Sequence, residues 1–107
     1  MKYLLVINLK EEEKLNDLLQ SLTEMKMLDS VVLDGSGVRR ILGEDSPVFS
    51  DWLKGTIMQH EYNSTILTPI ENEEDVGALK EILDDYGLDF SDKRTGFLCL
   101  IPVMKDV

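Results

Sequence analysis

The chain has 107 residues, 43% of them hydrophobic, which is enough for one core and leaves no room for a second. Eleven Lys and Arg stand against 21 Asp and Glu, so the formal net charge at pH 7 is -10. This charge disfavours nucleic acid and anionic membrane as partners, although a local basic patch can still hold a small anion. We therefore expect a single domain over residues 1–107, with no nucleic-acid partner and no membrane insertion.

The first half of the chain reads as strand, helix and strand. Lys2–Asn8 (KYLLVIN) is a short apolar run that is typical of a central strand. Lys10–Leu28 spaces its leucines by three and four residues and begins with glutamates, which predicts an amphipathic helix. Ser30–Asp34 (SVVLD) predicts a second strand, which a right-handed crossover could place parallel to the first.

The second half repeats this pattern. Thr65–Ile70 (TILTPI) predicts a third strand, and Pro69 within it favours a strand end or an edge because proline lacks an amide donor. Asn72–Tyr86 predicts a second amphipathic helix with Asn72 as its N-cap. Gly96–Val103 (GFLCLIPV) is a strongly apolar fourth strand.

Three single residues in the second half carry predictions of their own. Gly87 suits the C-terminus of the second helix. Gly77 inside that helix costs roughly 1 kcal/mol relative to alanine, so we expect it to permit close packing. Cys99 is the only cysteine and lies in an apolar run, so we expect a buried thiol that acts as a small hydrophobe.

This order of elements predicts an α+β fold, a ferredoxin-like β-α-β-β-α-β sandwich. We expect a four-stranded antiparallel sheet with both helices on one face and a long insertion, residues 35–64, between the second and third strands. The first and fourth strands are apolar almost throughout, so the other sheet face would expose a large apolar patch. The composition of the strands therefore predicts a homo-oligomer.

The central stretch Asp34–Thr65 divides into two parts. Its root, Gly35–Arg40, joins glycines to a pair of arginines and is the ligand-binding candidate. Its middle, Pro47–Met58, is too apolar for plain disorder and reads as a packed flap. Within the flap, aromatic and aliphatic side chains predict a contact with a neighbouring subunit or a partner protein, through Phe49, Trp52 and Leu53.

Catalytic and metal-binding patterns are weak. His60, the only histidine, adjoins Glu61 but has no second histidine or cysteine at ligand spacing, so we expect no metal site. No Ser-His-Asp set or Cys-His pair emerges, so we expect no enzyme. The sequence shows no signal peptide and no apolar run long enough to span a bilayer, and we expect a cytoplasmic protein.

Three segments resemble the nitrogen-regulatory P-II and P-II-like signalling proteins. KYLLVINLKEEEKLNDLLQSL is similar to the first strand and helix of that family, and VVLDGSGVRRILGE to its second strand and the entry to its long T-loop. RTGFLCLIPV is similar to the exit of its B-loop and its fourth strand. The likeness is that of a divergent member: DKRTG is a short B-loop, the family's C-terminal arm is missing, and Tyr62 is a poor counterpart of the tyrosine that many members modify.

The resemblance implies a trimer with adenine-nucleotide clefts between subunits and a T-loop that contacts partner proteins. Matching of the motifs places two groups of residues at such a cleft. The T-loop side comprises Gly35, Gly37, Arg39 and Arg40. The B-loop side comprises Lys93, Arg94, Thr95 and Gly96.

The leading hypothesis is thus a regulatory protein that binds a small anion or an adenine nucleotide and transmits this through the central loop. Two alternatives remain open. One is a structural or interaction module whose loop is permanently packed and whose cleft is empty. The other is a metal-linked trimer resembling the CutA proteins, which share the fold.

Overall fold

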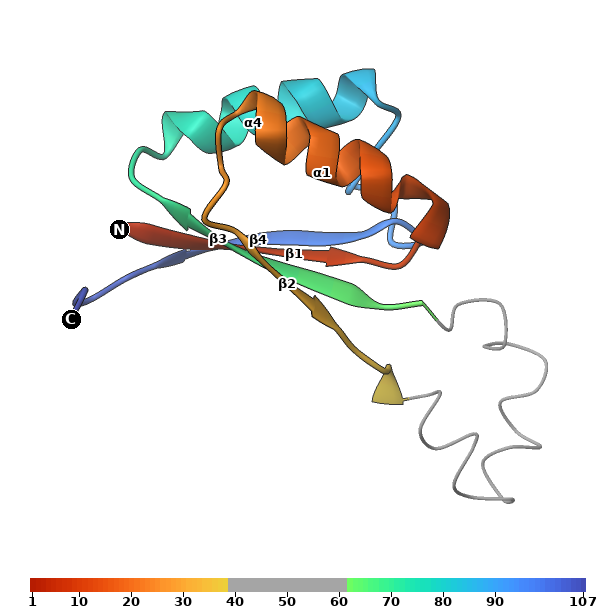
Figure 1. The fold of residues 1–107 in the computed structure, drawn as a ribbon, viewed down its shortest axis with the longest axis horizontal. Coiled ribbons are helices and arrows are strands. Elements are labelled where there is room, and N and C mark those ends of the chain that lie inside the picture. Colours follow the sequence, from red (N-terminus) through yellow and green to blue (C-terminus); the bar gives the residue numbers. More distant parts are fainter. Residues whose placement is uncertain (39–61) are drawn as a thin grey trace.

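A computed structural model describes residues 1–38 and 62–107 of the chain (Figure 1). The predicted insertion therefore falls largely outside the described residues, and only its two roots are seen. All the predicted strands and helices lie inside the described ranges.

The four strands form one antiparallel sheet in the order β2-β3-β1-β4. Their bounds are β1 Tyr3–Leu9, β2 Val31–Asp34, β3 Ser64–Ile70 and β4 Gly96–Pro102. The ferredoxin-like prediction is confirmed. The suggestion that the first two strands are parallel neighbours is wrong, because β3 lies between β1 and β2 and pairs with both. Pro69 lies past Leu67, the last residue of β3 that pairs with β2, as a strand-end proline should.

Both long helices cover the same face of the sheet (Figure 1). A short 3-10 turn, Glu12–Lys14, leads into α1, Leu15–Glu24, and α4 spans Glu74–Asp85. Each helix begins with carboxylates, which the partial positive charge of a helix N-terminus stabilises. The hydroxyl of Tyr86 donates a hydrogen bond of 2.9 Å to Glu24, which joins the ends of the two helices.

The core lies between the helices and the sheet. Every second residue of β3, and of β1 from Leu5 onward, points toward the helices and is buried, as the two-residue period of a strand requires. The helices supply leucines at three- and four-residue spacing. The core residues are Leu5, Ile7, Leu9, Leu18, Leu22, Ile66, Ile70, Leu79, Leu83 and Leu88.

Two predictions about α4 are wrong and one is confirmed. Asn72 is not the N-cap: that position belongs to Glu73, whose side chain makes no capping bond. A Cβ added to Gly77 would meet nothing within 4 Å in the described structure, so no close packing explains this glycine. Gly87 does end the helix, with a left-handed φ of 78°.

The second face of the sheet carries no helix. Strand alternation places Val31 and Leu33 of β2 and Phe97, Cys99 and Ile101 of β4 on this open face, and all five are exposed. The prediction of a buried Cys99 is therefore wrong for the single chain, because Cys99 lies opposite Val6, out of phase with the core residues Leu5, Ile7 and Leu9 of β1. The open face is the apolar patch that the sequence predicted.

Candidate functional site

Both predicted ligand-binding segments lie at one end of the sheet. Strand β2 ends at Asp34 opposite Ser64, where β3 begins. Strand β1 ends at Leu9 opposite Gly96, where β4 begins. The segments that follow β2 and precede β4 therefore emerge at the same end, which Figure 1 shows on the side where the insertion departs.

The two segments nevertheless belong to opposite edges of the sheet. Strand β2 forms one edge and β4 the other, with β3 and β1 between them. Neighbouring strands are about 4.8 Å apart, so three spacings separate the two roots by roughly 14 Å. One chain alone therefore does not bring Gly35 and Gly37 into contact with Lys93–Gly96.

A network of asparagines holds the first root. The amide of Gly35 donates a hydrogen bond of 2.8 Å to the carbonyl of Asn63. The side-chain amide of Asn8 donates to Asn63 Oδ1 at 2.5 Å and lies 3.2 Å from Thr65 Oγ1. Asn8 is only 6% exposed, so these bonds compensate its burial. A Cβ on Gly37 would lie 3.9 Å from Asn63 Nδ2, an ordinary contact.

Sequence reasoning did not find these two asparagines. Asn8 is the polar residue that closes the apolar run of β1, and Asn63 immediately precedes β3. Polarity at the end of a buried strand was the signal for Asn8. Nothing in the sequence marks Asn63 as its partner, because the two are 55 residues apart and meet only through the pairing of β1 with β3.

Five predicted residues lie outside the described residues. They are Arg39 and Arg40 of the root and Phe49, Trp52 and Leu53 of the flap. His60 lies outside as well. The roles proposed for them stay predictions.

The turn before β4 is built on Thr95 and Gly96. Gly96 has a φ of 138°, and a Cβ there would lie 1.7 Å from the carbonyl oxygen of Asn8. Thr95 is 6% exposed, and its hydroxyl donates to the Glu11 carboxylate at 3.3 Å. Its amide donates to the carbonyl of Asp92 at 3.0 Å, and its carbonyl accepts from Lys10 at 2.8 Å. Both residues thus fix the turn against the end of β1.

Arg94, in the same turn, is engaged by a neighbouring carboxylate. Its Nε and Nη2 donate to Asp92 Oδ1 and Oδ2 at 3.2 and 3.0 Å. These hydrogen bonds lower the pKa of the Asp92 carboxyl below its usual value and raise the pKa of the Arg94 guanidinium. The Arg94 side chain is 78% exposed, so the pair lies at the surface of the turn.

Two buried hydroxyls near the first root lack partners. Neither Tyr62 Oη nor Ser64 Oγ makes a hydrogen bond in the structure as described. Tyr62 packs on the core, and Ser64 is fully buried at the first position of β3. Unsatisfied buried hydroxyls are uncommon, and these two lie directly beside the return of the insertion.

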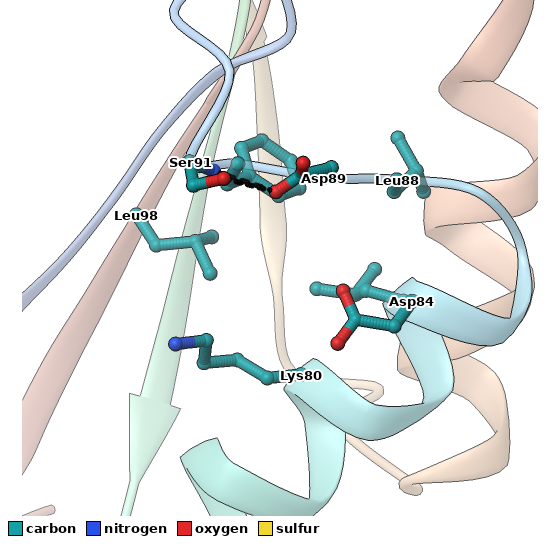
Figure 2. Close-up of a pocket in the computed structure, with 8 residues that line it drawn as sticks. Lys80, Asp84, Leu88, Asp89, Ser91 and Leu98 are labelled. Carbon is teal, nitrogen blue, oxygen red and sulfur yellow. Dashed lines mark hydrogen bonds between the residues drawn. The ribbon is translucent and has the colours of Figure 1, made fainter.

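The cavities described in the structure lie away from both roots. The one in Figure 2, of about 300 Å³, opens between the C-terminal half of α4 and β4. Lys80 and Asp84 border it on the helix side, Leu98 on the strand side, and the Asp89–Ser91 hydrogen bond on the loop. None of the predicted ligand-binding residues lines a described cavity.

Among residues 1–38 and 62–107, no group of three or more His, Cys, Asp or Glu side chains is arranged to hold a metal ion. No helix in these ranges is both long enough and apolar enough to span a bilayer.

Comparison with known proteins identifies the fold. A PII protein of Arabidopsis thaliana, solved with bound citrate, matches with a TM-score of 0.56 at 14% identity, over 95% of this chain and 78% of that one. A protein of unknown function from Pediococcus pentosaceus matches with a TM-score of 0.59 at 18% identity, over 100% of this chain and 97% of that one. No family model and no curated protein matches the sequence. The chain thus has a PII-like fold, and at these identities the likeness extends to the fold alone.

Proposed function

We propose that this chain is a non-enzymatic, cytoplasmic, P-II-like regulatory protein that assembles as a trimer. It binds a small anion or an adenine nucleotide between subunits and transmits binding through its central insertion to a partner protein. The observation that carries this proposal is the position of the two loop roots, which lie at one end of a PII-like sheet but on its opposite edges.

A second copy of the chain would complete the site. In a head-to-tail arrangement, the β2 edge of one copy faces the β4 edge of the next. Strand β2 ends at the same end of the sheet at which β4 begins. This arrangement therefore sets Gly35 and Gly37 beside the next copy's Lys93–Gly96. Heterologous contacts of this kind close into rings when the rotation allows, and the ring we propose is a trimer.

The open face of the sheet supports assembly. Val31, Leu33, Phe97 and Ile101 are 52, 47, 49 and 43% exposed. Exposed apolar side chains on an uncovered sheet face mark an interaction site or an aggregation hazard. Packing of three such faces against one another would remove this surface from water.

A calorimetric titration tests ligand binding. We expect heat on titration with at least one of ATP, ADP, AMP, a cyclic nucleotide or citrate, the last because the Arabidopsis PII structure contains it. Arg40→Ala should abolish that heat. The matched control is Lys105→Ala, which removes the same charge beyond β4, at the opposite end of the sheet. Absence of heat with all five ligands would refute the ligand-binding part of the proposal.

Light scattering with thiol labelling tests the assembly. We expect a mass of three chains, near three times 12.2 kDa. Cys99, exposed in the single chain, should react slowly with a maleimide in the native assembly and rapidly in urea. A monomeric mass with fast native labelling would exclude the trimer.

One observation favours the second candidate function, an interaction module with an empty cleft. The single described arginine of the predicted site, Arg94, is already paired with Asp92. Limited proteolysis distinguishes the two functions. Resistance of residues 39–61 to cleavage without ligand favours the module, whereas protection that depends on ligand favours the sensor.

A further inference from the structure

The turn before β4 already holds a carboxylate where an anion would bind. Arg94 presents Nε and Nη2 to the two oxygens of Asp92, at 3.2 and 3.0 Å. This is the two-pronged geometry with which arginine binds carboxylate and phosphate ligands. In this state one full side of the Arg94 fork is occupied by the protein itself.

The backbone holds this carboxylate in position. Asp92 Oδ1 also accepts the amide of Arg94 at 2.9 Å, and the carbonyl of Asp92 accepts the amide of Thr95 at 3.0 Å. Asp92 thus needs little further ordering to reach Arg94. A free carboxylate that offers the same two bonds must also lose translational and rotational freedom, so it competes poorly.

A second carboxylate stands beside the first. Glu11 accepts the hydroxyl of Thr95 at 3.3 Å, and its negative charge also acts on Arg94. Two of the four residues predicted for this side of the cleft, Arg94 and Thr95, therefore bind carboxylates of their own chain. An incoming anion would therefore meet these two carboxylates in the same turn as the cations Lys93 and Arg94.

We propose that Asp92 is an internal competitor for Arg94 that selects multiply charged anions over singly charged ones. The inference rests on the proposed function and concerns the same site. Coulomb attraction to Arg94 and Lys93 scales with the charge of the ligand. A di- or trianion can therefore displace Asp92, whereas a monocarboxylate only exchanges one single charge for another. Asp92 is a specificity-determining residue of the site.

The binding test compares citrate and acetate on three proteins. Wild type should bind citrate and give no heat with acetate. Asp92→Asn keeps an oxygen for the Arg94 amide and removes the charge, so it should bind citrate about two- to fivefold more tightly, the range expected for an exposed ion pair, and should also give heat with acetate. Asp29→Asn removes the same charge before β2, at the opposite end of the sheet, and should leave binding unchanged. Equal gains in both variants would show a general charge effect and overturn the inference.

A second measurement judges the contact without any ligand. Carboxyl NMR should show Asp92 titrating below its usual pKa in wild type and at a higher pKa in Arg94→Gln, where the hydrogen bond from the backbone amide of residue 94 remains but the guanidinium is gone. The other charged groups near this turn, Glu11 and Asp89, remain in both proteins. An ordinary Asp92 pKa in wild type would overturn the inference whatever the ligand tests show. A confirmed contact with no binding by wild type or Asp92→Asn would instead overturn the proposed function, and the selectivity with it.

Discussion

The two halves of the chain share one plan but differ in how they complete it. Each half contributes one central strand, one helix and one edge strand: β1, α1 and β2 in the first, β3, α4 and β4 in the second. The edge strands differ most, since β2 has four residues, all exposed, and β4 has seven that begin at a glycine of positive φ. The helix ends use the same hydrogen bonds with different residues. The two halves therefore share the arrangement of their backbone elements, whereas the residues that stabilise this arrangement differ between them.

The largest expected effect lies at the start of β4. In Gly96→Ala, the added Cβ would lie 1.7 Å from the Asn8 carbonyl oxygen, at a φ of 138° that side chains rarely adopt. We expect a loss of at least about 4 kcal/mol in unfolding free energy, or no folded protein. Urea denaturation followed by circular dichroism would measure it.

The control comes from the other edge strand. Gly35 follows β2, and a Cβ there would lie 3.8 Å from Asn63 O, an ordinary contact. Gly35→Ala should therefore change stability by less than about 1 kcal/mol. Comparable losses in the two variants would mean that the two edge strands are equally constrained.

The next effect should be the same in both halves. Leu18 of α1 and Leu79 of α4 are both fully buried against the sheet. Leu18→Ala and Leu79→Ala should each cost about 3 kcal/mol, because each removes buried methyl groups and leaves a cavity. Urea midpoints at constant slope would test this. A difference above about 2 kcal/mol between the two losses of unfolding free energy would show that one helix contributes much more to the stability of the core than the other.

Periodicity explains why the fold was predictable. The three- and four-residue spacing of leucines indicates helices with one apolar side, and α1 and α4 both lie inside the predicted ranges, although α1 is shorter than the predicted Lys10–Leu28. The order of the strands in the sheet was harder to predict. A helical crossover is compatible with β2 beside β1 or with β3 between them, and only the second arrangement is present.

Burial within β4 could not be read from its sequence. In FLCLIPV nearly every residue is apolar, so the run lacks the alternation that would separate the two faces. The pairing of β4 with β1 decides the matter and places Cys99 on the open face. The capping prediction failed for a similar reason, since Asn72 and Glu73 are both plausible first residues and only the backbone distinguishes them.

The candidate site was predictable as segments, and its internal contacts were not. Gly35, Gly37 and Lys93–Gly96 lie at one sheet end, as an arrangement of loops at strand termini requires. The contacts that carboxylates make with Arg94 and Thr95 were seen only in the structure. Asp92 stands two residues before Arg94, a spacing typical of aspartates that bond the following backbone, and that signal was available in DKRTG. Glu11 is 84 residues from Thr95, and its contact depends on the whole sheet.

The helix ends predict effects of opposite sign. After α1, Lys26 has a left-handed φ of 58°, and Met27 and Lys26 donate to the carbonyls of Leu22 and Thr23. After α4, Gly87 takes the same role. Gly87→Ala should cost about 1.5 kcal/mol, and Lys26→Gly should gain about 1 kcal/mol, because only glycine adopts this conformation without strain.

Thermal denaturation of the two variants measures this reversal. Lys26→Gln is the control for loss of the Lys26 charge. It keeps the backbone strain and should leave the free energy of unfolding within about 0.5 kcal/mol of wild type. If Lys26→Gly destabilised the protein, the Lys26 side chain would have a role that offsets its backbone strain.

The smallest expected effect concerns Gly77, which has no counterpart in α1. A Cβ there would meet nothing within 4 Å in the described structure, so Gly77→Ala should raise stability by about 0.7 kcal/mol through helix propensity and a less disordered unfolded chain. The adjacent exposed residue offers the matched control, since Ala78→Gly should lower stability by a similar amount. Both changes can be measured by urea denaturation. A loss on Gly77→Ala would mean that this side of α4 is covered in the assembly, and the close packing that the sequence predicted would then belong to a neighbouring copy.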